Sequence, residues 1–324
     1  MRKCSLMAAV VMLQAMTSSA LAQEAVSAYP SKPVRVIVAQ AAGGGADNVA
    51  RLFAAKVGEP LGRQFIIENH PGRDIAWTMV ARAKPDGYTL LSVVPDFTFA
   101  SALYPNLPVN PSKDFEPISL LTRTPFQLVV NAAFPARTLQ EFIAKAKADD
   151  GKVNMAGGLP GTGTHLLSVW FLSQAGIKAT YVPYKGIFQA VIDLLAGRVD
   201  VTFATASATP HIKSGKLRSL GASTAQRARY LPDVPTIQEQ GVVFDGSSWQ
   251  GWAATGGTSA PIINKLWGEL AKAAKSPELA KTLSVDNAET VGNSPEEFRK
   301  FMGAEFPRWM KVVKESNIKA EDGL

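Results

Sequence analysis

The chain has 324 residues, of which 46% are hydrophobic and 19% are charged, and its formal net charge is +7. This length suffices for about two domains with buried cores, and the composition is that of an ordinary soluble protein. The positive residues are spread among acidic ones without a dense lysine or arginine run, which argues against a nucleic-acid partner.

The first 22 residues have the pattern of a secretory signal peptide. A short basic start precedes the apolar stretch 6–13, and Ala20 and Ala22 fit the small-residue cleavage pattern, so we predict cleavage after Ala22. Cys4, the only cysteine, is removed with this segment, so the mature chain has no internal disulfide. No later segment reaches the roughly 20 apolar residues that a membrane span needs. We therefore expect a free periplasmic protein.

Strand and helix patterns alternate from residue 34 onward. The first half of the chain predicts a strand, a helix, a strand, a helix and a strand, followed by a proline-rich segment without regular structure. These segments are 34–39, 49–61, 65–68, 75–83, 88–94 and 103–115. Strands alternating with helices in this way are typical of a parallel sheet covered by helices.

The alternation restarts after two more strands, at 117–122 and 127–131. Three helices and three strands then follow, and a strand and three helices end the chain. They are helices 139–148, 164–175 and 187–196, strands 153–156, 179–182 and 201–204, strand 249–254, and helices beginning near 262, 277 and 294. We therefore divide the mature chain into domain 1, residues 23–128 plus 247–324, and domain 2, residues 129–246. The last helix opens with Ser294, a proline and two glutamates, which predicts a capping box.

Motifs of common enzymes are absent from the sequence. It contains no GxxxxGK[ST] phosphate loop, no GxGxxG fingerprint, no GxSxG elbow and no HExxH or paired CxxC motif. Its histidines, His70, His165 and His211, lie far apart along the chain. We therefore predict no cofactor, no metal and no enzymatic activity. The alternative is an exported α/β hydrolase or transferase whose cleft contains Asp47, Thr162 and His165.

Four junctions lead from a strand through a turn of small residues into a helix, at 39–48, 69–74, 156–165 and 182–186. Such junctions gather at the carboxyl ends of parallel strands, where ligands bind, and each helix start offers N–H donors to an anion. One helix terminus contributes about 0.3 to 1 kcal/mol, whereas micromolar binding needs about 8 kcal/mol. Several termini would have to converge from both domains. For any single turn, tight packing of helix on strand is the alternative.

A series of motifs runs in order through the chain: YPSKPVRVIV, GGGAD, KPDGYTL, LYPNLPVNPSKDFEPISLL, VPYKG, HIKSGKLRSLG and LPDVPTIQEQG. This series resembles the Bug (TctC-like) family of extracytoplasmic solute receptors. The resemblance implies an α/β periplasmic binding protein of the type II-like class, with two domains closing on a small carboxylate. That solute would be a di- or tricarboxylate, an amino acid or an aromatic acid. The implied partners are membrane subunits of a tripartite tricarboxylate transporter or the exported domain of a sensor, and we expect a monomer.

The resemblance also implies where the carboxylate binds. Family members use backbone N–H groups, hydroxyls and bridging water from the first glycine turn and from the matching turn of the second domain. For His165, capping or packing is the alternative to ligand contact, and Trp249 either walls the cleft or packs in the core or at the hinge. Tyr184 is expected to line the pocket beside a solvated Lys185. The candidate ligand-binding residues are Ala41, Gly43, Gly44, Gly45, Asp47, Gly158, Gly161, Thr162, Gly163, Thr164, His165, Tyr184 and Thr205.

The second junction, NHPGRDIAW, departs from the family pattern, which usually reads like NRPGAGG. Asp74 stands where a helix start would otherwise meet an anion. One hypothesis is a site altered for specificity, in which Asp74 binds an amine of the solute and Trp77 its ring. In the alternative, Arg73 and Asp74 form a solvated pair and Trp77 belongs to the core.

Overall fold

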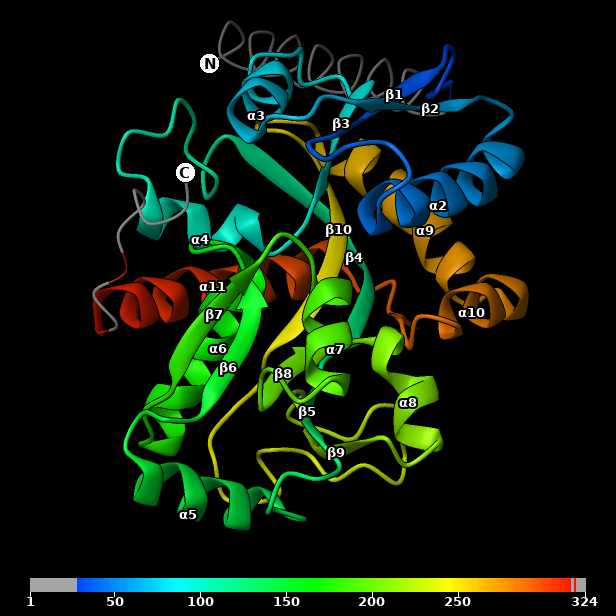
Figure 1. The fold of residues 1–324 in the computed structure, drawn as a ribbon. Helices are drawn as coiled ribbons and strands as arrows, with labels where there is room; N and C mark the ends of the chain where they lie inside the picture. The colour runs from blue at the N-terminus through cyan, green and yellow to red at the C-terminus, as the bar shows by residue number, and fades with distance from the viewer. Residues whose placement is uncertain (1–27, 316–317, 319–324) are drawn as a thin grey trace, which may run out of the picture.

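The computed structural model describes residues 28–315 and 318, so the predicted signal peptide lies outside the described residues. These residues form two α/β units, each built on its own sheet flanked by helices (Figure 1). The two α/β units are as predicted, whereas both sheets contain antiparallel strand pairs besides the predicted parallel ones. No helix in the described part of the chain has the length and apolar character needed to cross a membrane.

The first sheet has six strands. They are β1 (Val34–Val38), β2 (Phe65–Asn69), β3 (Thr89–Val93), β4 (Phe115–Pro125), β10 (Ser247–Thr255) and β11 (Glu289–Thr290). Their order is β11-β4-β10-β3-β1-β2. Strand β1 pairs in parallel with β2 and β3, whereas β10 pairs antiparallel with β3 and β4. The long antiparallel strands β4 and β10 therefore extend the parallel part toward the second unit (Figure 1).

Helices cover both faces of this sheet, and each face has its own hydrophobic cluster. One face is covered by α2 (Gly45–Leu61), α9 (Ala260–Ala274) and α10 (Pro277–Ser284), and the other by α3 (Arg73–Ala81), α4 (Asp96–Leu103) and α11 (Pro295–Glu315). In α2, Ala50, Phe53, Ala54 and Val57 are buried. Their helical spacing puts them on one face, and this is why the hydrophobic periodicity of the sequence predicted the helix.

The second sheet has five strands in the order β7-β6-β8-β5-β9. Its strands are β5 (Gln127–Asn131), β6 (Asn154–Gly158), β7 (Thr180–Tyr184), β8 (Val201–Ala204) and β9 (Leu217–Ala222). Its helices are α5 (Leu139–Asp149), α6 (Gly163–Ala175), α7 (Ile187–Leu195) and α8 (Thr209–Lys213), with the short turn η1 (Ala206–Ala208). Strand β6 pairs in parallel with β7 and β8. The carboxyl end of β6 leads into the turn before α6.

Most of the predicted segments lie within a few residues of the observed ones, but α4, α8, β9, the two-residue strand β11 and the turn η1 were not predicted. Helix α4 begins Asp-Phe-Thr-Phe, a run of residues with modest helix propensity, so its pattern was not recognised. The predicted capping box is confirmed. The N–H of Ser294 donates to Oε2 of Glu297 at 2.8 Å, and the N–H of Glu297 donates to Oγ of Ser294 at 3.2 Å.

The two units are joined by short connections. Strand β4 ends at Pro125 and β5 begins at Gln127, so the proposed boundary at residue 129 falls inside β5. Helix α11 packs on both units, because Phe298 near its start lies in a core cluster of the first sheet and Trp309 near its end lies in the main cluster of the second. The last helix thus belongs to both cores.

Candidate functional site

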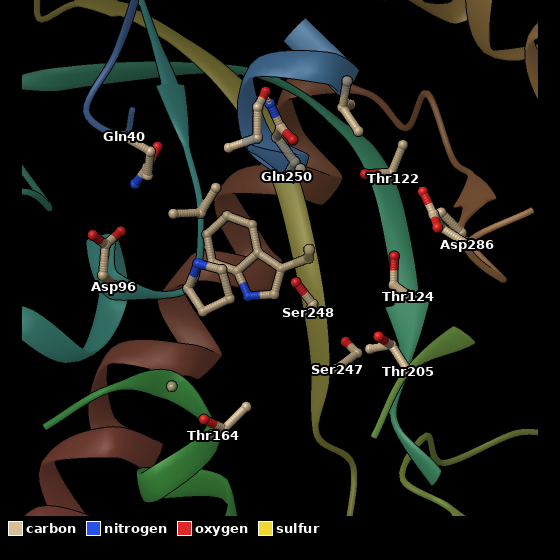
Figure 2. A pocket seen from close by; sticks show the side chains of 18 of the residues that line it. Gln40, Asp96, Thr122, Thr124, Thr164, Thr205, Ser247, Ser248, Gln250 and Asp286 are labelled. Carbon is tan, nitrogen blue, oxygen red and sulfur yellow. Dashed lines mark hydrogen bonds between the residues drawn. The ribbon is translucent and has the colours of Figure 1, made fainter. Parts of the chain in front are cut away.

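A cavity of about 1100 Å³ lies between the two units and is lined by residues from both. The first unit contributes the starts of α2, α3 and α4 and parts of β4 and β10, and the second contributes the turn before α6 and the end of β8. Polar side chains project around this space (Figure 2). Those labelled there are Gln40, Asp96, Thr122, Thr124, Thr164, Thr205, Ser247, Ser248, Gln250 and Asp286.

The start of α2 is one wall of the cavity, where Gly45 lines the space. The N-cap residue, Gly44, has no side chain to cap the helix. The turn is held by Asp47, which is only 2% exposed and accepts hydrogen bonds from the N–H of Gly43 at 2.9 Å and from Nε of Arg51 at 3.0 Å. Burial raises the pKa of Asp47, but these hydrogen bonds outweigh it and hold the pKa below its usual value.

Only one of the predicted residues of the first turn therefore lines the cavity. Gly45 lines the cavity, whereas Ala41, Gly43, Gly44 and Asp47 do not. Asp47 positions the turn from inside instead of facing a solute.

The start of α6 is the facing wall, where Gly161, Thr162, Gly163 and Thr164 line the cavity. The Oγ1 of Thr164 accepts the N–H of Gly158 at 3.0 Å, which leaves its own hydroxyl proton free to donate. No acidic residue occupies the first turn of α6. The partial positive charge of this helix end is therefore not neutralised by its own side chains.

His165 and Gly158 act within this turn and do not line the cavity. Nδ1 of His165 accepts the N–H of Gly161 at 3.1 Å, and its ring packs against Tyr181 with centroids 4.7 Å apart. A Cβ added at Gly158 would overlap the hydroxyl oxygens of Thr162 and Thr164. Glycine is therefore needed there for close packing.

Of the two other candidates in the second unit, Thr205 lines the cavity and Tyr184 does not. Tyr184 lies on the edge strand β7 and donates its hydroxyl to Oδ2 of Asp193 at 2.7 Å. Burial, followed by this hydrogen bond to a carboxylate, raises the pKa of Tyr184 to about 12.

The three residues of the second junction occupy different environments: Arg73 lies at the cavity, Asp74 is exposed and Trp77 is buried. Arg73 lines the cavity, and its guanidinium lies 3.9 Å from the centre of the Tyr104 ring. Its Nε donates to Oδ1 of Asp74 at 2.9 Å, and the Asp74 side chain is 54% exposed. Trp77 is 1% exposed and packs edge-on against Phe97. These contacts match the interpretation of Arg73 and Asp74 as a solvated pair and of Trp77 as core.

Sequence reasoning missed most of the polar side chains on β4 and β10. Thr122 and Thr124 line the cavity from β4, and Ser248 and Gln250 line it from β10. Each pair is spaced by two residues, so its members point to the same side of their strand. Gln250 also donates from Nε2 to the carbonyl of Ala46 at 2.7 Å and so ties β10 to the start of α2. A polar residue at every second position of these strands was the signal in the sequence that could have identified them.

Two further lining residues have buried polar atoms without a hydrogen-bond partner among the described residues. They are Oε1 of Gln40 and the indole Nε1 of Trp249. Trp249 is 2% exposed, so it both packs in the core and walls the cleft. Such buried polar atoms are uncommon, and at a cavity wall they are available to a bound solute.

Asp96 also lines the cavity, at the start of α4. Burial raises the pKa of Asp96 to about 7, although the positive charge of Arg73 acts in the opposite direction. Within residues 28–315 and 318, no group of three or more histidine, cysteine, aspartate or glutamate side chains is arranged to hold a metal ion.

Comparisons with known proteins identify what the chain is similar to. The TctC family model, described as the tripartite tricarboxylate transporter family receptor, matches residues 49–318. Protein BugT of Bordetella pertussis is 32% identical over 317 residues, which cover 96% of this chain and 97% of BugT.

Three solved structures share the fold. The periplasmic binding protein BugD is 32% identical with a TM-score of 0.71, covering 90% of this chain and 99% of BugD. MatC of Rhodopseudomonas palustris, solved with bound malate, is 31% identical with a TM-score of 0.71 and covers 88% of this chain and 100% of MatC. Rpa4515 of R. palustris, solved with adipate, is 31% identical with a TM-score of 0.74 and covers 90% of this chain and 99% of Rpa4515.

Proposed function

This chain belongs to the TctC family of solute-binding receptors, and we propose that it captures a small carboxylated metabolite in the periplasm. One observation carries the proposal: the N-termini of α2 and α6, one from each unit, border the same cavity. Each terminus offers N–H donors and a partial positive charge to an anion. The malate and adipate bound to MatC and Rpa4515 are carboxylates of this kind.

The energetics favour capture by both units together. One partly buried helix terminus contributes up to about 2 kcal/mol, and a hydrogen bond to a charged group about 1.5 to 3 kcal/mol. The second unit alone, with one terminus and the hydroxyl of Thr164, stays well below the roughly 8 kcal/mol of micromolar binding, and the first unit approaches it only with every contribution at its upper value. The two termini with the hydroxyls of Thr164, Thr124 and Ser248 reach it, provided that the units close on the solute.

The family description supports a role in transport for the captured solute. The closed receptor presents its solute to membrane subunits of a tripartite tricarboxylate transporter or to the exported domain of a sensor. We propose that it works as a monomer, since opening and closing need only the two units of one chain. Light scattering of the purified protein, with and without solute, tests this.

The hydrolase alternative draws no support from the geometry. Thr162 donates its hydroxyl to the carbonyl of Leu159 at 2.7 Å, Nδ1 of His165 accepts from the backbone of Gly161, and Asp47 is held by its own turn. All three side chains thus have structural partners. We propose that the protein binds its solute without chemical change.

Isothermal titration with a panel of organic acids, including malate and adipate, tests the proposal. The decisive variant is Gly45→Leu, which adds a side chain at the α2 wall, and its matched control is Gly268→Leu in α9. An added Cβ meets no atom within 4 Å at either position, so both variants should fold. We expect at least a tenfold loss of affinity in Gly45→Leu and none in Gly268→Leu. If no acid binds to the wild type, the proposal is wrong.

A further inference from the structure

The carboxyl group of Asp96 lines the cavity at the start of α4. It is half-buried at the cavity wall and forms no ion pair within 4.0 Å in the part of the chain that the structure describes. The nearby positive charge is that of Arg73 on α3. This guanidinium already donates from Nε to Asp74 and stacks on the ring of Tyr104. The carboxyl group of Asp96 is thus available to a group inside the cavity.

Gln40 supplies a second acceptor on the same side of the cavity as Asp96 (Figure 2). Its Oε1 is buried without a hydrogen-bond partner among the described residues, while its backbone carbonyl accepts from Nδ2 of Asn69 at 3.2 Å. A buried acceptor without a donor is unfavourable. An ammonium group carries three N–H donors and no acceptor, so it matches a carboxylate and an amide oxygen together.

The electrostatic surroundings favour a cation at this place. Burial raises the pKa of Asp96 to about 7, against the effects of the Arg73 charge and the N–H of Phe97. The other charged side chains that line the cavity are Arg51, which pairs with Asp47, Arg73, which pairs with Asp74, and Asp286, which lies near Thr122 of β4 in Figure 2. A bound cation would offset the loss of hydration of the carboxylate, whereas a second anion would be repelled.

The cavity therefore offers groups of both polarities. The N-termini of α2 and α6 attract negative charge, and the oxygens of Asp96 and Gln40 attract positive charge. We infer that the solute is zwitterionic, with a cationic nitrogen bound between Asp96 and Gln40 and a carboxylate at the two helix starts. The inference rests on the proposed function, which assigns the carboxylate end. It places the amine at Asp96, not at Asp74, whose carboxylate is already paired and is turned to solvent.

Titration calorimetry with matched pairs of acids tests the inference. The pairs are succinate and aspartate, adipate and 2-aminoadipate, hexanoate and 6-aminohexanoate, and 4-methylbenzoate and 4-(aminomethyl)benzoate. We expect the aminated member of at least one pair to bind ten- to a hundredfold more tightly, as for a charge-assisted hydrogen bond. Asp96→Asn, which keeps the shape of the side chain, should abolish this preference, and Gln40→Leu should reduce it severalfold.

The control is Asp150→Asn, which removes an exposed carboxylate at the end of α5, where asparagine also tolerates the left-handed backbone. It should leave the preference unchanged, and melting curves verify that all variants are folded. If the wild type binds acids equally well without the amine, or if Asp96→Asn keeps the preference, the inference is wrong and the proposed function stands. If the wild type binds none of the acids, both are wrong.

Discussion

The backbone N–H of Gly43 donates to Oδ2 of Asp47 at 2.9 Å, across the turn that precedes α2. The same carboxylate pairs with Arg51 one helical turn later. Asp47 therefore holds the glycine turn in shape, and the turn presents its free donors to the cavity through Gly45.

Asp47→Ala should lower the free energy of unfolding by about 1 to 3 kcal/mol, because the N–H of Gly43 and the guanidinium of Arg51 both lose a charged acceptor. It should also weaken solute binding, since the turn at the α2 start loosens. Denaturant unfolding and titration calorimetry measure the two effects. Glu59→Ala, at an exposed position of the same helix, is the control and should change neither.

The contribution of Asp47 to the free energy of unfolding also depends on pH. Its pKa is lower in the folded protein than in the unfolded chain, so the stabilisation is present above the unfolded value and is lost as pH falls through the folded value. The stability difference between wild type and Asp47→Ala should therefore shrink in acid. A constant difference down to pH 2 would contradict this assignment.

Asp96 should show the opposite dependence. Its folded pKa of about 7 lies above the value near 3.9 of an unfolded aspartate, so the folded state binds the extra proton between these values. Stability from this group is present at acid pH and is lost as pH rises toward neutral. The free energy of unfolding of Asp96→Asn, relative to that of the wild type, should therefore rise by at least about 1 kcal/mol from pH 4 to pH 8, because one pKa unit corresponds to about 1.4 kcal/mol. Urea unfolding across this range measures the gain, and a gain that does not change with pH would contradict it.

Gly158→Ala should disturb the second wall of the cavity. The added methyl group would displace the hydroxyls of Thr162 and Thr164, and overpacking of this kind costs about 1 to 3 kcal/mol. We expect lower stability together with weaker solute binding. Gly303→Ala in α11, where the added Cβ has open space, is the matched control and should be neutral or slightly stabilising.

Trp249 should report binding through its fluorescence. It lines the cavity with its buried indole N–H unpartnered among the described residues, so a solute that accepts this hydrogen bond changes its surroundings. Saturating solute should change the emission of wild type, and Trp249→Phe should show a smaller change, with Trp309 as the other tryptophan in the lining. Trp267→Phe, in α9 outside the cavity lining, should keep it. Equal signals in the two variants would exclude Trp249 as the reporter.

Some parts of the candidate site could be predicted from the sequence and others could not. The turns before α2 and α6 were predicted because strand periodicity, glycine runs and helix starts are local signals. The roles of Asp47, His165 and Tyr184 were not, because each of these side chains has the chemistry of a ligand but bonds to its own unit. Sequence shows which groups are present but not which atoms they already contact.

The sequence by itself determined the alternation of strands and helices, the two α/β units and the position of two donor-rich turns, because these depend on neighbours within a few residues. Only the tertiary structure decided that β4 and β10 line the same cavity and that α4 brings Asp96 to the cavity that Gln40 also lines. Those contacts join segments distant in the chain, and their register depends on how whole elements pack. The charge pattern of the cavity is therefore a property of the fold.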